Sequence, residues 1–340
     1  MSTVNKCLGC GALLQTTDQH KVGYALSLEH TYCQSCYRLL HYGEGSIHFH
    51  PEDLPKLEPD SIIFMISSIL HIDLLLSYPV HRYQPDAKYV YIINQIDLLP
   101  KSTNFDLLIE NITNQAKKQG VPFIDIILMS AKNEFDINNL KAYIKSYKEK
   151  HMYLVGVQNS GKTTIFKALT GTKEALAFKK AGLTQEALIG NFSNKVIYDL
   201  PGLYQAGYLH QFLPYEVYKR LIPETEINPK IYQLKSNQSL FIEGLCAITF
   251  LKDINITLYL EKTVHIHKTN QSRIKQLLEE KEKHFKIFVD EYIEQAFKVP
   301  TGKHQVTFAD MGFMHLVGPL TIKMIIPKHM HISMTEALFQ

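Results

Sequence analysis

One short stretch, Gly156-Val-Gln-Asn-Ser-Gly-Lys162-Thr163, constrains the fold of this chain more than any other feature. It follows an apolar segment at 152–157 and precedes an amphipathic segment at 162–169. A strand followed by a helix is the setting that the pattern G-x-x-x-x-G-K-[ST] requires. The glycines let backbone N–H groups face phosphate oxygens, and the helix N-terminus adds positive potential. A chance match on a strand–helix turn is the alternative, and the flanking pattern favours a phosphate-binding P-loop.

The residues of this loop have expected roles toward a nucleotide. Lys162 would neutralise the β- and γ-phosphates, and the hydroxyl of Thr163 would bind Mg²⁺. Asn159 has two interpretations that stay open. It resembles the asparagine with which some GTPases hold an activating K⁺, and it is also typical of a side chain that stabilises a loop. The other loop residues that we expect to contact the nucleotide are Gly156, Ser160, Gly161 and Thr164.

Apolar runs alternate with amphipathic segments between about residue 60 and residue 204. Two of the amphipathic segments, 105–119 and 137–148, space their apolar residues as helices do. The runs are short and rich in Ile and Val, as buried parallel strands are, and they lie at 62–66, 89–93, 124–129, 153–157 and 196–198. Strands that alternate with helices predict a doubly wound α/β sheet.

The pattern changes beyond about residue 210. Residues 254–260 and 263–267 alternate between apolar and polar, as antiparallel strands do. Residues 271–285 predict a charged amphipathic helix, and 320–326 predict one more strand. We therefore expect a separate α+β domain at the C-terminal end.

Three further motifs, each directly after an expected strand, indicate a guanine nucleotide. Asn94-Gln-Ile-Asp97 resembles the motif Asn-Lys-x-Asp, whose carboxylate accepts hydrogen bonds from the ring N–H and the exocyclic amine of guanine. Ser130-Ala131-Lys132 matches the Ser-Ala-Lys element that contacts the same base. Asp199-Leu-Pro-Gly202 matches Asp-x-x-Gly, whose Asp holds Mg²⁺ through water and whose Gly senses the γ-phosphate.

Each of these motifs alone has a plainer interpretation. Asn94 and Asp97 are typical turn residues, Lys132 is typical of a solvated charge, and Asp199 is a common helix cap. Together with the P-loop, however, the motifs follow the carboxyl ends of strands, where folds of this class bind ligands. The set therefore predicts a site for GTP and GDP with Mg²⁺.

The order of the motifs differs from that of ordinary GTPases, in which the P-loop comes first and the base motifs come last. Here the base motifs at 94–97 and 130–132 precede the P-loop, and Asp199 comes last. This order predicts a circularly permuted GTPase domain, which is tolerable because domain termini often lie close together. The segment after Asp199 moves in GTPases when the γ-phosphate is lost. We therefore expect nucleotide state to be coupled to the position of the C-terminal domain.

Four of the five cysteines form two C-x₂-C pairs near the N-terminus, with 22 residues between the pairs. Four thiolates at this spacing are typical of a closed structural zinc site. A redox pair and free thiols are the alternatives. We expect Zn²⁺ to supply much of the folding energy of this module. The expected ligands are Cys7, Cys10, Cys33 and Cys36.

Charge and hydropathy exclude some classes of protein. Lys plus Arg number 36 and Asp plus Glu 33, so a net charge of +3 excludes a polybasic tail as the whole basis of nucleic-acid binding. The most hydrophobic stretch, 62–80, is interrupted by His71 and Asp73, which makes a membrane span unfavourable. The chain begins without the apolar core of a secretory signal. We expect a cytoplasmic protein without a membrane partner, in which Cys246 is a buried core residue.

The chain as a whole resembles the YqeH family of circularly permuted ribosome-assembly GTPases, in which a four-Cys zinc module precedes permuted GTPase motifs. The resemblance covers residues 7–338 and includes Ser239-Leu-Phe-Ile-Glu-Gly244-Leu, Asp310-Met-Gly-Phe-Met and the segment 326–338. It implies three domains. These are a treble-clef-like zinc module at 1–50, the GTPase domain at 51–209 and the α+β domain at 210–340.

The resemblance also implies a function. The chain would be a GTP-binding and GTP-hydrolysing switch that assists assembly of the small ribosomal subunit, with flanking domains that contact rRNA or ribosomal protein of the subunit or its precursor. The stretch Ala181-Gly-Leu-Thr184 stands where the family has its switch threonine. By this resemblance Thr184 contacts Mg²⁺ and the γ-phosphate and joins Lys162 as a catalytic residue.

The chain departs in several places from the family or from GTPases in general, and three of these departures, at Gln95, at the neighbours of Thr184 and at Leu203, favour a second hypothesis. Gln95 replaces the motif Lys, Ser67 stands where the family tends to have Asp, and the neighbours of Thr184 differ. Leu203 stands where many GTPases keep a water-orienting Gln, so we expect slow intrinsic turnover. The second hypothesis is a guanine-nucleotide-binding scaffold or sensor that barely hydrolyses GTP. A metabolic P-loop kinase is a third, and the base motifs argue against it.

Overall fold

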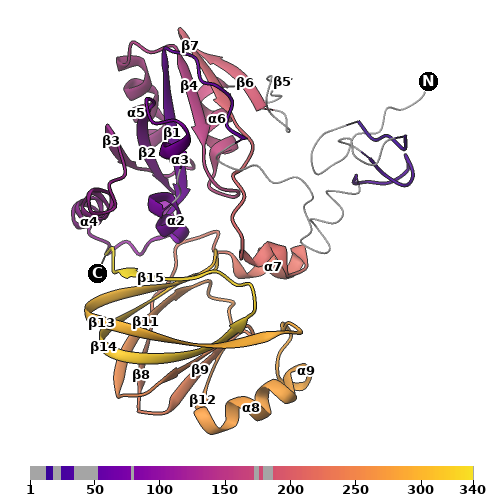
Figure 1. Cartoon of the computed structure of the whole chain (residues 1–340), viewed down its shortest axis with the longest axis vertical. Coiled ribbons are helices and arrows are strands. Elements are labelled where there is room, and N and C mark those ends of the chain that lie inside the picture. Colours follow the sequence, from indigo (N-terminus) through magenta and orange to yellow (C-terminus); the bar gives the residue numbers. More distant parts are fainter. Residues whose placement is uncertain are drawn as a thin grey trace.

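Two β-sheets organise the protein. Its structure is a computed structural model that describes residues 13–17, 24–33, 53–77, 80–171, 176–178 and 187–339. One sheet has seven strands, which lie between residues 61 and 199, and the other has eight strands, which lie between residues 230 and 336. Figure 1 shows the two sheets one above the other, with helix α7 (Tyr215–Leu221) between them and the C-terminus beside α4 (Phe105–Lys118).

The seven-stranded sheet has the order β3-β2-β1-β4-β7-β6-β5. Its first five strands in this order run parallel to their neighbours, and β6 and β5 are antiparallel. The strands are β1 Ser61–Ser68, β2 Lys88–Asn94, β3 Asp125–Leu128, β4 His151–Val155, β5 Leu176–Phe178, β6 Ala187–Phe192 and β7 Lys195–Asp199. The central strands are buried on both faces, which explains why they read as continuous apolar runs.

Helices cover both faces of this sheet. Ile62, Phe64 and Ile66 of β1 pack into one apolar cluster with α5 and α6, and Ile63 and Met65 pack into another on the opposite face. The helices are α2 Ile72–Ser77, α3 Val80–Tyr83, α4, α5 Glu134–Ser146 and α6 Lys162–Thr170, and the 3₁₀ turns are η2 Ile69–His71 and η3 Ile96–Leu98.

Asparagines begin the two long helices of this domain. The Asn104 side chain accepts a hydrogen bond from Leu107 N at 3.0 Å at the start of α4, and Asn133 accepts one from Phe135 N at 2.9 Å at the start of α5. These caps satisfy backbone donors that the first helical turn leaves unpaired. The caps fix the first residue of each helix. Helix α4 begins at residue 105, as its apolar spacing predicts, whereas α5 begins at residue 134, three residues before its apolar spacing indicates.

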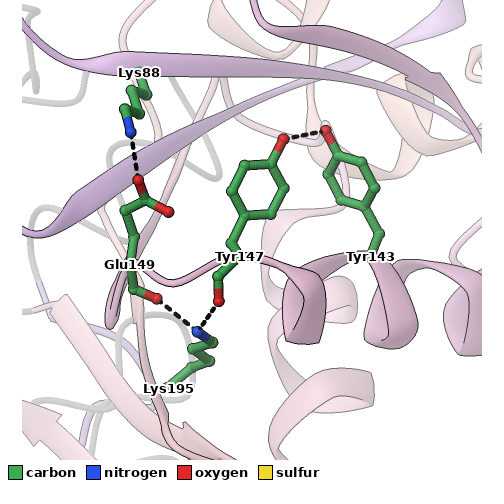
Figure 2. A network of polar contacts seen from close by, with 5 residues as sticks. All are labelled: Lys88, Tyr143, Tyr147, Glu149 and Lys195. Atoms are coloured by element: carbon green, nitrogen blue, oxygen red, sulfur yellow. Dashed lines mark hydrogen bonds and ion pairs between the residues drawn. The ribbon is translucent and has the colours of Figure 1, made fainter.

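The connection from α5 to β4 joins the half of the domain that carries the base motifs to the half that carries the P-loop. A polar network holds this connection at the amino-terminal edge of the sheet (Figure 2). Buried Lys195 donates hydrogen bonds to the carbonyls of Tyr147 and Glu149, and the Glu149 carboxylate pairs with Lys88 at the start of β2. The hydroxyls of Tyr143 and Tyr147 are 2.7 Å apart. Strands β2 and β7 are thus tied to the short loop that leads into β4.

The eight-stranded sheet is antiparallel and follows the path β12-β9-β10-β14-β11-β8, with β13 paired to β14 and β15 paired to β13. Its longest pair, β13 and β14, contains a register shift near residue 300. The strands are β8 Lys230–Leu234, β9 Gln238–Ile242, β10 Cys246–Phe250, β11 Ile254–Leu260, β12 Ile266–Asn270, β13 Tyr292–Phe308, β14 Gly312–Pro327 and β15 Ile332–Glu336.

The C-terminal region differs in two details from the sequence prediction. The strand predicted at 263–267 is shifted by three residues to 266–270, where it forms β12, because a turn occupies residues 262–263. The helix predicted at 271–285 is divided into α8 Gln271–Glu279 and α9 Lys281–His284, because Glu280 leaves helical geometry. Besides α7, these are the helices among the described residues of this region, so the region is β-rich rather than an even mixture. Cys246 is buried, as predicted.

The segment from Leu203 to Ile227 joins the two sheets and shares their largest apolar core. Its buried residues pack with side chains from both sheets; they are Leu203, Tyr208, Leu209, Leu213, Tyr218, Leu221 and Ile227. The segment contains η4 (Leu209–Gln211) and α7. The second half of the chain is therefore packed against the first half through the residues that directly follow Asp199.

Candidate nucleotide-binding site

A cavity of 660 Å³ lies at the carboxyl ends of the parallel strands. Most of its lining comes from the first sheet, and the rest comes from α7, the segment after it and one turn of the second sheet. The lining residues are Ser68, Leu70, His71, Gln95, Leu98, Lys132, Asn159, Gly161, Lys162, Thr163, Thr164, Tyr218, Lys219, Ile222, Pro223, Glu224, Thr225 and Asp310. A cleft at this edge of the sheet is the ordinary ligand site of doubly wound folds.

The P-loop connects β4 to α6, as the sequence predicts, and two of its glycines are required by close approach. A Cβ on Gly156 would lie 2.0 Å from the carbonyl oxygen of Ile66. Gly161 has a φ of +86°, and its Cβ would lie 2.2 Å from Nδ2 of Asn94. Any larger residue at either position would push the loop away from the neighbouring strands.

Lys162 and Thr163 begin α6 at the bottom of the cleft. The ammonium of Lys162 donates to the carbonyls of Gly156 at 3.0 Å and Val157 at 3.2 Å. Burial lowers the pKa of Lys162 to about 8, although the Asp199 carboxylate acts in the opposite direction. A cation that is this poorly solvated gains much from a phosphate partner.

Asp199 ends β7 next to Thr163. Its Oδ2 accepts a hydrogen bond from Thr163 Oγ1 at 2.7 Å, and burial raises the pKa of this carboxyl. The other oxygen, Oδ1, is buried and has no hydrogen-bond partner among the described residues. A hydroxyl and a buried carboxylate oxygen are hard oxygen donors of the kind that Mg²⁺ prefers. The residues therefore fit the predicted metal at this position.

Asn94 joins the two halves of the cleft. Its Nδ2 donates to the carbonyl of Ser160 in the P-loop at 2.9 Å, and its Oδ1 accepts from Ala131 N at 2.9 Å. Asn94 is buried, and the absence of a side chain at Gly161 leaves space for its amide group. One side chain thus sets the distance between the phosphate loop and the Ser-Ala-Lys element.

The residues predicted to recognise the base lie close to one another. Asp97 lies in η3, with its carboxylate 3.7 Å from the ammonium of Lys132. The Ser130 hydroxyl accepts from Lys132 N at 3.2 Å, which holds the short turn in shape. Gln95 has a φ of +64°, an αL conformation that gives η3 its sharp entry. The Asp97 side chain remains one-third exposed.

The Asp-x-x-Gly segment runs beneath the P-loop. A Cβ on Gly202 would lie 2.7 Å from Cγ of Gln158, and Leu203 N donates to the Gly156 carbonyl at 2.9 Å. The Leu203 side chain is only 1% exposed and packs under the loop with Val157 and Leu75. It supplies neither a polar group nor a charge to the cleft.

Several predicted site residues lie outside the described residues, and these predictions remain as they were. They are Thr184, Cys7, Cys10 and Cys36. Cys33 is described, and it is buried with Leu14 and Ala25. Within the described ranges no group of three His, Cys, Asp or Glu residues could hold a metal ion. No helix of those ranges is both long and apolar enough to cross a membrane.

Sequence reasoning missed the residues that close the cleft from outside the P-loop sheet. Lys132 Nζ donates to the Glu224 carbonyl at 2.8 Å, and Asn159 Nδ2 donates to the hydroxyl of Tyr218 at 2.7 Å. Asp310, from the turn between β13 and β14, also lines the cleft. The stretch that contains Asp310 is recognisable only through the family resemblance. Neither Tyr218 nor Glu224 belongs to a recognisable motif.

Comparison with known proteins agrees with this geometry. The sequence model of the family described as "50S ribosome-binding GTPase" matches residues 151–289, which begin at the P-loop strand and leave the base motifs outside the match. The YqeH protein of Bacillus subtilis is 26% identical over 98% of both chains.

Two further relatives match over part of their length. The chloroplastic GTP-binding protein Brassinazole insensitive pale green 2 of Arabidopsis thaliana is 28% identical over 53% of this chain and 30% of its own length. A GTP-binding protein of Methanocaldococcus jannaschii is 32% identical over 34% of this chain and 30% of its own length. The near full-length similarity and the GTPase domain together identify the chain as a divergent, YqeH-like GTPase.

Proposed function

We propose that the chain is a GTP-binding and GTP-hydrolysing switch that assists assembly of the small ribosomal subunit. The observation that carries the nucleotide part is the amide of Asn94, which bonds both to the P-loop at Ser160 and to the Ser-Ala-Lys element at Ala131. Because this amide couples the phosphate loop to the base pocket, a ligand with both phosphates and a guanine base fits the cleft best.

The chemistry follows from the residues at each end of the cleft. The P-loop amides and Lys162 would hold the phosphates, and Thr163 with Asp199 would hold Mg²⁺, which neutralises charge on the β- and γ-oxygens. Asp97 would accept two hydrogen bonds from guanine, a donor pair that adenine does not present. The switch threonine, Thr184, would complete the γ-phosphate contacts.

The ribosomal part of the proposal rests on resemblance. The matching family is described as a ribosome-binding GTPase, and similarity to YqeH extends over almost the whole chain. The family description names the 50S subunit, whereas the arrangement of motifs and flanking domains resembles a family that acts on the small subunit. The experiment must therefore offer both subunits.

The experiment is sedimentation of the full-length protein with each ribosomal subunit through sucrose. The added nucleotide is GDP, a non-hydrolysable GTP analogue, or none. We expect co-migration with the small subunit only in the GTP-like state, and no co-migration of the Lys162→Ala variant under any condition. Co-migration with the large subunit alone would contradict the assignment to the small subunit, but the proposal of a nucleotide-dependent switch would stand.

A guanine-nucleotide-binding scaffold or sensor is the second candidate, and the buried Leu203 side chain favours it. With no water-orienting Gln in this position, intrinsic hydrolysis should be slow. Hydrolysis that small subunits stimulate distinguishes the switch from the scaffold. A preference for ATP over GTP would contradict both and favour a kinase.

Two ion proposals accompany this function. We propose Zn²⁺ at Cys7, Cys10, Cys33 and Cys36, to be tested by metal analysis of protein purified under reducing conditions. We also propose that Asn159 supports K⁺ dependence, because its nitrogen is bound to Tyr218 and its carbonyl oxygen makes no other hydrogen bond among the described residues. Nucleotide binding and turnover in K⁺ and in Na⁺ test this second proposal.

A further inference from the structure

The wall of the cleft opposite the P-loop sheet comes from two other parts of the chain. Helix α7 lies between the two sheets (Figure 1) and places Tyr218 over the P-loop. The turn between β13 and β14 places Asp310 beside it. Neither residue belongs to a known nucleotide-binding motif, yet both side chains are less than one-tenth exposed and line the same cavity as Lys162.

Tyr218 makes a direct polar contact with the P-loop. Its hydroxyl accepts a hydrogen bond from Asn159 Nδ2 at 2.7 Å. Its ring packs edge-on against His210, with the ring centres 5.7 Å apart, so the phenol has little freedom to move. Asn159 itself has a φ of +61°, an unusual conformation for an asparagine that positions its side chain toward α7.

Asp310 holds the segment that follows Asp199 and also faces Tyr218. Its Oδ1 accepts a hydrogen bond from Leu209 N at 3.0 Å, and the Tyr218 hydroxyl stabilises its charged form. Burial outweighs these contacts and raises the pKa of Asp310 to about 6. Within the described residues no Lys or Arg pairs with it, and Oδ2 completes no hydrogen bond of ordinary geometry.

The chemistry of the three groups sets the direction of the contacts. The phenol oxygen of Tyr218 accepts from an N–H of Asn159, so its own proton is available to another acceptor, and the Asp310 carboxyl is the acceptor that it faces. Because the amide of Asn159 is planar and its nitrogen is bound to Tyr218, its carbonyl oxygen faces away from Tyr218. The orientation of one P-loop side chain thus depends on a tyrosine of α7 that faces a buried carboxyl group of the C-terminal β-domain.

We propose that Tyr218 and Asp310 are positioning residues of the nucleotide site, which orient Asn159 at the γ-phosphate end of the P-loop. The proposal rests on the proposed function, because it concerns how the same cleft binds GTP. Asp310 also holds Leu209 in the segment that should respond to the γ-phosphate. The C-terminal β-domain therefore contributes a group that discriminates GTP from GDP.

The test measures dissociation rates of fluorescent GDP and of a fluorescent non-hydrolysable GTP analogue from the full-length protein. The variants are Tyr218→Phe, which keeps the ring, and Asp310→Asn, which keeps an acceptor for Leu209 N. Tyr232→Phe changes a half-buried tyrosine on β8, away from the cleft, and is the matched control. In both variants we expect the GTP analogue to dissociate about tenfold faster, the size of one buried hydrogen bond, and GDP to change less than twofold.

A double-variant comparison separates positioning from loss of structure. Because Tyr218 acts through Asn159, Tyr218→Phe combined with Asn159→Ala should be no worse than Asn159→Ala alone. Additive losses would overturn the proposal. So would equal losses for GDP and the GTP analogue, or variants that behave as the Tyr232→Phe control does. If the wild-type protein binds neither nucleotide, the proposed function itself fails, and that result is distinct from any of these.

Discussion

The two sheets contribute to one cleft in different ways. In the first sheet the parallel strands end at one edge, so the polar residues that follow β2, β3, β4 and β7 meet there without further arrangement. In the second sheet the antiparallel strands end alternately at both edges, and only the turn between β13 and β14 reaches the cleft, through Asp310. Local motifs describe the first contribution, whereas the second depends on how the two sheets pack.

The largest effect is expected when the first sheet loses Lys162, the side chain that we expect to bind the phosphates. Lys162→Ala should weaken binding of GTP and GDP by about a hundredfold or more, because a buried ammonium supplies charge-assisted hydrogen bonds to the phosphates. Isothermal titration calorimetry measures the affinity. The far-ultraviolet circular dichroism of the variant should stay unchanged, since the second sheet does not use this side chain. Unchanged affinity would remove the P-loop from the site.

The second prediction concerns the point where the two regions meet. Gly207 has a φ of +86°, and a Cβ there would lie 2.5 Å from the carbonyl oxygen of His329 and 2.5 Å from His331 N. Gly207→Ala should therefore lower the free energy of unfolding by about 2–3 kcal/mol, through strain at a backbone-lined contact. Urea denaturation gives the value. Gly120→Ala, which meets nothing within 4 Å although its φ is also positive, is the control for conformational strain alone.

The third prediction sharpens the account of the base pocket. Asp97→Asn should weaken GTP binding by about 2 kcal/mol, or thirtyfold, because a carboxylate that accepts two hydrogen bonds is replaced by an amide. Affinity for xanthosine triphosphate should rise, since its ring carries the complementary groups. Competition against a fluorescent GDP measures both. Retained preference for GTP would exclude Asn94 and Asp97 from the base site.

The contrast between the sheets also explains what the sequence could predict. The parallel strands of the first domain are buried on both faces and read as apolar runs, and the motifs follow them directly. The first half of β13 mixes exposed and partly buried residues without strict alternation, and Pro300 and Gly302 interrupt the strand near its middle, so its length has no clear pattern. Asp310 and Tyr218 are 92 residues apart and meet only after folding, and no local signal connects them. The helix predicted at 271–285 is divided into two, which shows that the spacing of apolar residues alone does not locate the end of a helix.

The fourth prediction uses pH to probe the boundary between the sheets. His71 is buried there, and desolvation lowers its pKa to about 4, although Asp73 acts in the opposite direction and His331 in the same one. The folded state keeps His71 neutral while the unfolded chain takes up a proton below about pH 6.5. The free energy of unfolding should therefore fall by about 1–2 kcal/mol between pH 7 and pH 5 on account of this group. Urea denaturation of wild type and His71→Gln at both pH values isolates it, because the difference should shrink in the variant.

The smallest expected effect concerns the other contact between the two regions, where the C-terminal tail lies on α4. Asn111 donates to the Leu338 carbonyl at 2.9 Å, and Lys118 pairs with Glu336 at 2.9 Å, with both charged side chains 63% exposed. Lys118→Ala should change the free energy of unfolding by less than about 0.5 kcal/mol, since water screens an exposed ion pair. Asn111→Ala should cost about 1 kcal/mol, because it leaves a carbonyl near buried Leu338 without its donor. If Lys118→Ala were the more costly change, charge would hold the tail, and its contact with α4 would weaken with salt. The opposite order, which we expect, means that the hydrogen bond from Asn111 holds the tail on α4.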